Sequence, residues 1–157
     1  MTDPNDPVDV RSEFIEKVGL IAQGNDLPRA AGRMLGLLIF DGEATSFSAL
    51  AEQLQISRGS VSTATRLLQE RGLIKRLTKP GERQEYFQLA ETPYASMLAG
   101  VKTGIDRAHS EITDTLAKLP AHLSGPANRI SEYARLYQAL GHAIDQAISD
   151  IGDGQKD

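Results

Sequence analysis

The sequence has no cysteine and no tryptophan, and it has four phenylalanines and four tyrosines among 157 residues. Without cysteine the chain can form no disulfide bond, no thiolate metal site and no cysteine-based redox sensor. It has no apolar run of the length of about 18–20 residues that a membrane-spanning helix needs. The first residues lack the basic segment and apolar core of a secretion signal. We therefore expect a cytoplasmic protein with no membrane partner.

Motifs of catalysis and metal binding are also missing from the sequence. It contains no Gly-x-Ser-x-Gly turn of a hydrolase, no glycine-rich phosphate loop and no Cys/His nucleophile pair. His109, His122 and His142 are scattered and lack the i, i+4 spacing with a nearby acid that metal sites use. The sequence thus predicts neither an enzyme, nor a metal site, nor a cofactor.

The net charge of −4 hides an uneven distribution of charge along the chain. Residues 1–56 hold four basic and nine acidic side chains, whereas residues 57–83 hold seven basic and two acidic ones. Residues 84–157 are acidic again, with six basic and ten acidic side chains. A basic segment between acidic flanks is typical of a protein that contacts phosphate groups, so the pattern predicts double-stranded DNA as the partner.

The residues around this basic segment have the pattern of a helix-turn-helix. Apolar residues recur at helical spacing over residues 47–54, and Ser57 is a good N-cap for a second helix after a three-residue turn. Gly72 supplies a left-handed residue to end that helix, with Leu73 placed to contact Leu68 in a Schellman cap. Two such helices, the second with a small polar and basic face, indicate DNA binding.

A β-hairpin with a basic tip follows the second helix. Residues 73–77 and 84–89 are rich in Leu, Ile, Tyr and Phe, and the Pro80-Gly81 pair between them is a turn signal. A hairpin beside a recognition helix is a wing, whose tip can enter a minor groove. The candidate DNA-binding residues of helix and wing are Arg58, Ser60, Ser62, Thr63, Arg66, Arg76, Lys79 and Arg83.

These candidates also have less specific explanations. Arg66 can read a base edge or be a solvated arginine, and the hydroxyl residues can approach bases closely or be ordinary surface residues. Arg58 lies where the N-terminus of the helix attracts phosphate. Arg83 is the strongest candidate of the wing, whereas Arg76 and Lys79 fit a diffuse attraction for phosphate.

The helix-turn-helix segment resembles the winged-helix core of the MarR transcription regulators. The resemblance rests on Leu50-Ala-Glu-Gln-Leu-Gln-Ile-Ser57, Ser60-Val-Ser62 and Leu68-Gln-Glu-Arg-Gly-Leu-Ile74. The run Leu27-Pro28-Arg29-Ala30-Ala31-Gly32-Arg33 is similar to the GbsR-type branch of that family. The likeness implies a homodimer that binds DNA as a repressor or activator and often responds to a small-molecule effector. It also equates Arg83 with the family's wing-tip arginine, although Glu82 stands where the family commonly has Asp.

Apolar stripes outside the winged region predict helices that pair with a second copy of the chain. The helix over residues 11–23 has one apolar face, and the helix over residues 29–40 is apolar nearly all round, which places it in the core. Beyond Thr92-Pro93 the stripes reach coiled-coil spacing, and one small domain cannot bury them. The predicted dimer contacts are Phe14, Val18, Ile105, Ile112, Ile130, Tyr137 and Ile144.

The predicted fold is mainly α with a small β-hairpin wing, a winged helix-turn-helix with long dimerisation helices. Residues 1–10 are expected to form a mobile tail, 11–24 an N-terminal dimerisation helix and 26–90 the winged helix-turn-helix domain. Residues 92–151 are expected to form C-terminal dimerisation helices, broken at Pro120 and Ser124-Gly125-Pro126, and residues 152–157 a disordered tail. Tyr94, Met97 and Tyr133 could line an effector pocket or belong to the dimer core.

The sequence therefore predicts a sequence-specific transcription regulator, with repression the leading interpretation. Two recognition helices related by a two-fold axis meet major grooves about 34 Å apart, so the operator should be an imperfect palindrome. Flexing of the dimer helices would change this separation and give an effector a place to act. The alternative is a winged helix that contacts another protein, although such a surface should expose large apolar groups rather than a basic face.

Overall fold

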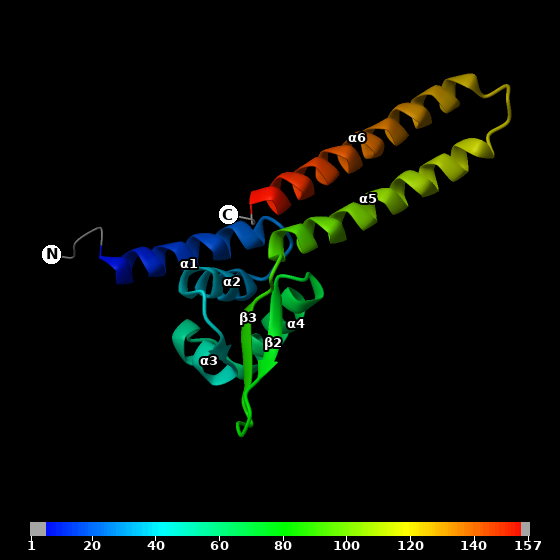
Figure 1. Ribbon diagram of the computed structural model, residues 1–157. Coiled ribbons are helices and arrows are strands. Elements are labelled where there is room, and N and C mark those ends of the chain that lie inside the picture. Colours follow the sequence, from blue (N-terminus) through cyan, green and yellow to red (C-terminus); the bar gives the residue numbers. More distant parts are fainter. Residues whose placement is uncertain (1–5, 155–157) are drawn as a thin grey trace. The chain divides into compact units, whose positions relative to one another are not determined.

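The computed structural model describes residues 6–154, except for the side chain of Asp153, and it confirms the predicted fold class. The elements are α1 (Pro7–Gln23), α2 (Arg29–Asp41), β1 (Thr45–Ser46), α3 (Phe47–Leu54), α4 (Arg58–Glu70), β2 (Ile74–Thr78), β3 (Glu85–Leu89), α5 (Pro93–Ala117) and α6 (Ser124–Gly154) (Figure 1). They belong to two compact units, Met1–Pro93 and Tyr94–Asp157. None of the helices within residues 6–154 is both long enough and apolar enough to cross a membrane.

Helix α2 forms the centre of the first unit. Six of its thirteen residues are buried, and Met34, Leu37 and Leu38 are at most 1% exposed. α1, α3, α4 and β3 all pack on it and cover its apolar sides. The prediction of a buried helix over residues 29–40 is confirmed.

Helix α1 begins four residues earlier than predicted. The Asp6 side chain accepts a hydrogen bond of 2.9 Å from the backbone N–H of Val8, and Pro7 occupies the first helical position, which suits its fixed φ. Residues 7–10 are therefore helical, and their assignment to a mobile tail was wrong. Residues 1–5 of that predicted tail lie outside the described residues.

The apolar face of α1 packs on α2 of the same chain. The rings of Phe14 and Phe40 lie 6.1 Å apart between centroids, and a Cβ on Gly36 would lie 3.1 Å from Val18 Cβ. Phe14 and Val18, two of the predicted dimer contacts, are thus half-buried within one chain. Leu20 and Ile21 point outward instead, with exposures of 58% and 64%.

Helix α4, the predicted recognition helix, has both of its predicted caps. Ser57 Oγ accepts a hydrogen bond of 3.0 Å from the backbone N–H of Ser60. At the other end Gly72 has φ +71°, its N–H donates to the Gln69 carbonyl, and the N–H of Leu73 donates to the Leu68 carbonyl. These two bonds define a Schellman cap, which confirms the prediction for this helix end.

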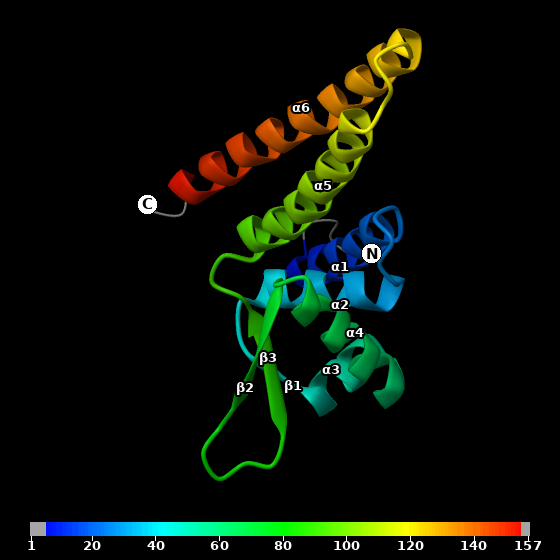
Figure 2. The same ribbon diagram turned by 90° about the vertical axis from the view of Figure 1, so that its right-hand side faces the viewer.

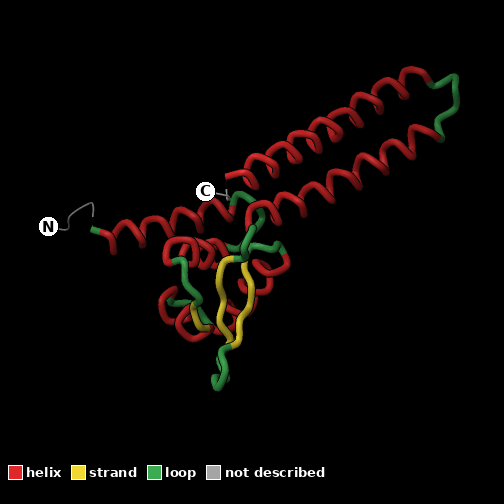
Figure 3. The backbone as a smooth tube through the Cα atoms, in the orientation of Figure 1, coloured by secondary structure: helices red, strands yellow, loops and turns green. Residues whose placement is uncertain are grey.

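The wing is a three-stranded sheet in the order β1-β3-β2 rather than a simple hairpin (Figure 3). β2 and β3 pair antiparallel, with Arg76 opposite Phe87, and the loop between them projects beyond α3 and α4 (Figure 2). The short strand β1 pairs with β3 through Thr45 and Ser46. Sequence reasoning missed β1 because its two residues form a strand only through this long-range pairing.

In the second unit, α5 and α6 run side by side in opposite directions (Figures 1 and 2). The predicted break at residues 124–126 is the start of α6, and Pro126 lies in its first turn, where the missing N–H has no helical partner to lose. α6 continues to Gly154, so residues 152–154 are helical instead of disordered. Residues 155–157 lie outside the described residues.

The pair of helices has almost no core of its own. Among the described residues of α5 and α6, only Pro93, Ala134 and Gly141 are buried. Ile105 faces Gly141 across the pair, with its Cγ2 at 3.9 Å from the position of a Cβ on that glycine. Ile105 and Ile144, like the other predicted dimer contacts of these helices, are half-buried in a single chain.

An ion pair between Arg11 and Asp41 joins α1 to the end of α2. Arg11 donates from Nε and Nη2 to the two carboxylate oxygens, both at 2.7 Å, and this hydrogen bonding holds the pKa of Asp41 below its ordinary value of 3.8. Since the folded pKa is depressed, the stabilisation is present above pH 3.8 and is lost as the pH falls through the folded pKa.

We therefore expect Asp41→Asn to lower the free energy of unfolding at pH 7 by about 1 kcal/mol. The difference from wild type should shrink when urea unfolding is repeated below pH 3.8. Glu52→Gln, at an exposed position of α3, is the control and should match wild type at both pH values. A difference for Asp41→Asn that is the same at both pH values would contradict this account.

Candidate nucleic-acid interface

Helix α4 separates a buried side from a small, polar, exposed side. Val61, Ala64, Thr65 and Leu68 are buried, and the Thr65 hydroxyl is satisfied by donating to the Ser62 carbonyl at 3.0 Å. Four of the predicted contact residues of α4, Arg58, Ser62, Thr63 and Arg66, are exposed, and Ser60 is half-buried. The short side chains leave room for a duplex to approach the helix backbone closely.

The N-terminus of α4 carries Arg58, whose guanidinium carbon lies 4.7 Å from the centre of the Phe47 ring. This cation–π contact holds the arginine beside the first turn of α4, where the helix dipole also favours an anion. Phe47 was not predicted as a site residue, and its role depends on the turn that brings α3 and α4 together. The arrangement can hold a phosphate group at the start of the helix.

Most cations of this surface have internal partners. Arg66 pairs with Glu70 at 3.0 Å one helical turn away, and Arg76 pairs with Glu85 across the sheet at 2.8 Å. The side chains of both pairs are 45–61% exposed to solvent. Each pair is therefore worth less than about 1 kcal/mol. Ligand phosphates can therefore compete with these carboxylates.

The wing tip carries two cations, Lys79 and Arg83, which have different surroundings. Lys79 Nζ lies 4.1 Å from the centre of the Tyr86 ring, and the Tyr86 hydroxyl donates to Glu82, which raises the pKa of Tyr86. Arg83 is exposed and makes no ion pair or ring contact with residues 6–154. It is thus the wing cation that is most available to a ligand.

A cleft of about 330 Å³ joins the recognition helix to the wing. Its lining includes Ser62, Arg66 and Gln69 from α4 with Arg76 and Glu85 from the sheet. The structure thus brings together three predicted residues, while Lys79 and Arg83 lie at the wing tip and Arg58 at the start of α4. Gln69 was missed, although residues 62, 66 and 69 share one face by helical spacing, and its amide can bond an adenine edge.

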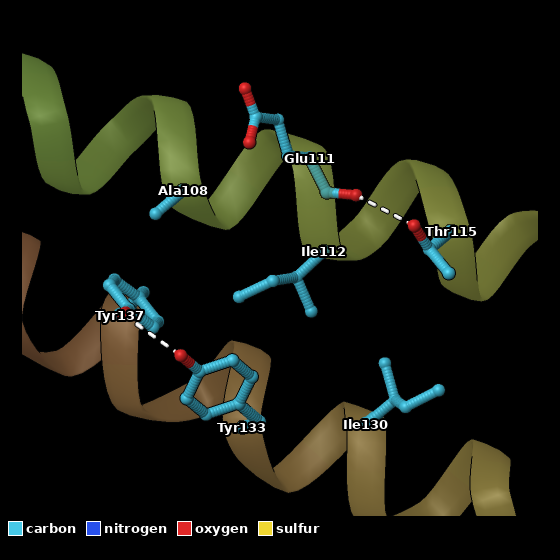
Figure 4. A pocket seen from close by; sticks show the side chains of 7 residues that line it. All are labelled: Ala108, Glu111, Ile112, Thr115, Ile130, Tyr133 and Tyr137. Atoms are coloured by element: carbon cyan, nitrogen blue, oxygen red, sulfur yellow. Dashed lines mark hydrogen bonds between the residues drawn. The ribbon is translucent and has the colours of Figure 1, made fainter.

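The predicted effector residues do not come together. Tyr133 lines a cavity of about 430 Å³ between α5 and α6 with Ile112, Ile130 and Tyr137 (Figure 4). Tyr94 and Met97 are not part of its lining, because Tyr94 lies about 20 Å along α5 from Ala108 at about 1.5 Å per residue.

Two tyrosines form one wall of this cavity. The hydroxyls of Tyr133 and Tyr137 lie 3.0 Å apart and their rings meet edge to face, with centroids 5.2 Å apart (Figure 4). The hydrogen bond raises the pKa of Tyr137. Ile112, Ile130 and Tyr137, predicted as contacts to a second copy, thus line a space between two helices of one chain.

Three comparisons relate the chain to known proteins. Residues 25–85 match the model of the MarR family. The chain is 41% identical over 142 residues to the HTH-type transcriptional regulator MmpR5 of Mycobacterium tuberculosis (strain ATCC 25618 / H37Rv), a match that covers 87% of this chain and 83% of that protein. A crystal structure of a transcriptional regulator aligns with a TM-score of 0.75 at 28% identity, covering 92% of this chain and 99% of the other. These matches do not distinguish branches of the family, so the GbsR-type assignment stays a prediction.

Proposed function

Because this chain belongs to the MarR family of transcription regulators, we propose that it represses transcription as a homodimer bound to a pseudo-palindromic operator. The cleft shared by α4 and the wing is the observation that supports the proposal best. Its lining includes Ser62, Arg66 and Arg76, and Arg83 is exposed in the loop of the same wing, between β2 and β3.

The chemistry of this surface suits a duplex. Helix α4 enters the major groove, with Arg66 and Gln69 facing base edges and Ser60, Ser62 and Thr63 allowing close approach. Arg58 and the first turn of α4 hold one phosphate, and Arg83 enters the adjacent minor groove. Arg76 and Lys79 add attraction for the backbone, which is independent of sequence.

The homodimer is supported by the second unit. A pair of helices with three buried residues needs a further apolar surface, and Val101, Leu136 and Leu140 are 41–52% exposed. A second copy supplies such a surface with closed two-fold symmetry. The two recognition helices then meet major grooves about 34 Å apart.

An effector would act on this dimer from the cavity beside Tyr133. A ligand with an apolar body and one hydrogen-bonding group fits the isoleucines and the tyrosine hydroxyls. Its binding would change the spacing of α5 and α6 and, through the dimer, the distance between the recognition helices. The protein would work in the cytoplasm, where its operator is.

The test is a binding titration with DNA selected from random sequences, at several salt concentrations, with Arg66→Ala and Arg83→Ala alongside wild type. We expect each variant to bind about tenfold more weakly, since removing one base contact costs about 1–3 kcal/mol. Arg83→Ala should also reduce the slope of log affinity against log salt, by about one for each phosphate that the variant no longer neutralises. Sedimentation should give two chains per operator.

Arg135→Ala is the matched control, because Arg135 is an exposed helical arginine with a weak pair to Glu132 at 4.0 Å. Its affinity should equal that of wild type. If selection yields no preferred sequence, or if all three variants bind as wild type does, the proposed operator binding is wrong. The surface of α4 and the wing would then contact a protein instead.

A further inference from the structure

Arg33 links three elements of the first unit. Its Nε donates to Glu16 Oε1 of α1 at 2.7 Å, and its Nη1 donates to the backbone carbonyl of Leu54 at 3.0 Å. Arg29, one turn earlier on α2, donates to the other carboxylate oxygen of Glu16 at 2.6 Å. Arg33 therefore joins α1 and α2 to the last residue of α3, whereas Arg29 joins only α1 and α2.

The Leu54 carbonyl lies where α3 ends and the turn to α4 begins. It belongs to the last turn of α3, where carbonyl groups have no partner within the helix. The next residue, Gln55, has φ +52°, and the chain then reaches the N-cap of α4 at Ser57. The bond from Arg33 thus fixes the point at which the turn to the recognition helix begins, and a cation suits this negative end of α3.

The Arg33 side chain passes close to α1 at Gly19. A Cβ at Gly19 would lie 2.8 Å from Arg33 Cγ and 3.2 Å from Arg29 Cγ, so both arginine stems cross α1 where it has no side chain. Arg33 is 23% exposed, compared with 51% for Arg29. Its charge-assisted bonds are consequently better shielded from water and stronger.

A second arginine supports the same connection. Arg11 of α1 donates to Gln53 Oε1 at 2.8 Å, in addition to its two bonds with Asp41. The last two residues of α3 are therefore both held by arginines that are anchored on α1 or on its partner α2. These hydrogen bonds to two adjacent residues, Gln53 and Leu54, oppose rotation of α3 and of the turn that follows it.

We infer that Arg33 is a positioning residue for DNA recognition. It lies outside the surface that contacts the duplex, but it sets the start of the turn to α4 and so the angle at which α4 meets the major groove. Because Arg33 is held by Glu16, a shift of α1 is passed on to this turn. This role rests on the operator binding proposed above and names a residue that controls it.

The test compares Arg33→Met with Arg29→Met in the full chain. Both variants keep the apolar stem and both remove one partner of Glu16, but only Arg33→Met removes the bond to the Leu54 carbonyl. We expect Arg33→Met to bind the selected operator about tenfold more weakly, as for the removal of a hydrogen bond to a charged group. Binding to random DNA and its salt dependence should not change, since Arg33 neutralises no phosphate.

Hydrogen exchange of the backbone amides of residues 55–60 gives a second readout. It should be faster in Arg33→Met than in wild type, and unchanged in Arg29→Met. If Arg33→Met does not fold, Arg33→Lys replaces it, because lysine keeps the charge but lacks the planar fork that reaches both acceptors. Arg33→Lys should show smaller losses of operator affinity and of amide protection than those expected for Arg33→Met.

Three outcomes overturn the inference. Wild-type operator affinity and amide exchange in Arg33→Met would show that the bond does not control the turn. Equal losses in Arg29→Met and Arg33→Met would show a general packing role for the Glu16 pairs. If wild type itself prefers no DNA sequence, the proposed function fails, and the positioning role fails with it.

Discussion

Gly32→Ala is expected to lower the free energy of unfolding by about 3 kcal/mol, the upper part of the usual range for an overpacked site. A Cβ at this position would lie 2.4 Å from Ala22 Cβ, 2.7 Å from the Val18 carbonyl oxygen and 2.8 Å from Gly19 Cα. Two of these three atoms belong to the backbone of α1, so no side-chain rotation relieves the overlap. α1 and α2 would have to separate, which also loosens the pairs of Glu16 with Arg29 and Arg33.

The control is Gly104→Ala, in the middle of α5. A Cβ there has no atom within 4 Å, and alanine is a better helix former than glycine by up to about 1 kcal/mol. Urea unfolding followed by circular dichroism should show Gly104→Ala at least as stable as wild type and Gly32→Ala far less stable. A wild-type midpoint for Gly32→Ala would mean that α1 and α2 do not cross as closely as the structure has them.

Thr63→Asp is expected to weaken operator binding by about 100-fold or more. Thr63 is exposed on α4 between the N-terminal turn and Arg66, so the new carboxylate would face the phosphates of the duplex. Like charges placed together at an interface cost several kcal/mol, and each 1.4 kcal/mol, roughly, is a factor of ten in affinity. The titration used for Arg66→Ala and Arg83→Ala measures this effect directly.

Thr103→Asp is the matched control for the change in net charge. Thr103 is also exposed and within a helix, α5, and Arg107 one turn later gives its carboxylate a partner. This variant should bind the operator within about twofold of wild type, a change below about 0.5 kcal/mol. If both variants lose affinity equally, the loss comes from net charge, and α4 is not the contact surface.

Local signals explain why the winged helix-turn-helix could be predicted so closely. Ser57, Gly72 and the Pro80-Gly81 pair each act on neighbouring residues, and the structure has the predicted N-cap, Schellman cap and wing turn at these positions. The start of α1 was also readable, because Asp6-Pro7 is a cap followed by a first-turn proline. The prediction of a mobile tail rested instead on the acidic, proline-containing composition of residues 1–10.

Long-range partners could not be read in the same way. An apolar stripe shows that a helix buries one face, but not whether the covering surface is in the same chain or in a second copy. The stripe of α1 was predicted to contact a second copy; within one chain Phe14 packs on Phe40 of α2 and is half-buried, and the contact with a second copy stays a prediction. The bond from Arg33 to the Leu54 carbonyl joins residues 21 positions apart, and only the folded chain shows it.

On the proposed DNA-binding surface, three arginines must leave partners within the protein before they can contact DNA. In the free protein Arg58 lies on the Phe47 ring, Arg66 on Glu70 and Arg76 on Glu85. Random DNA replaces these contacts with phosphate contacts, so breaking them lowers its net gain, by less than about 1 kcal/mol for each ion pair. In the proposed complex, the operator would also offer base edges to Arg66 and Gln69, a gain that random DNA does not provide. On this proposal, Glu70 and Glu85 reduce binding to the rest of the chromosome, so more of the protein stays free to find its operator.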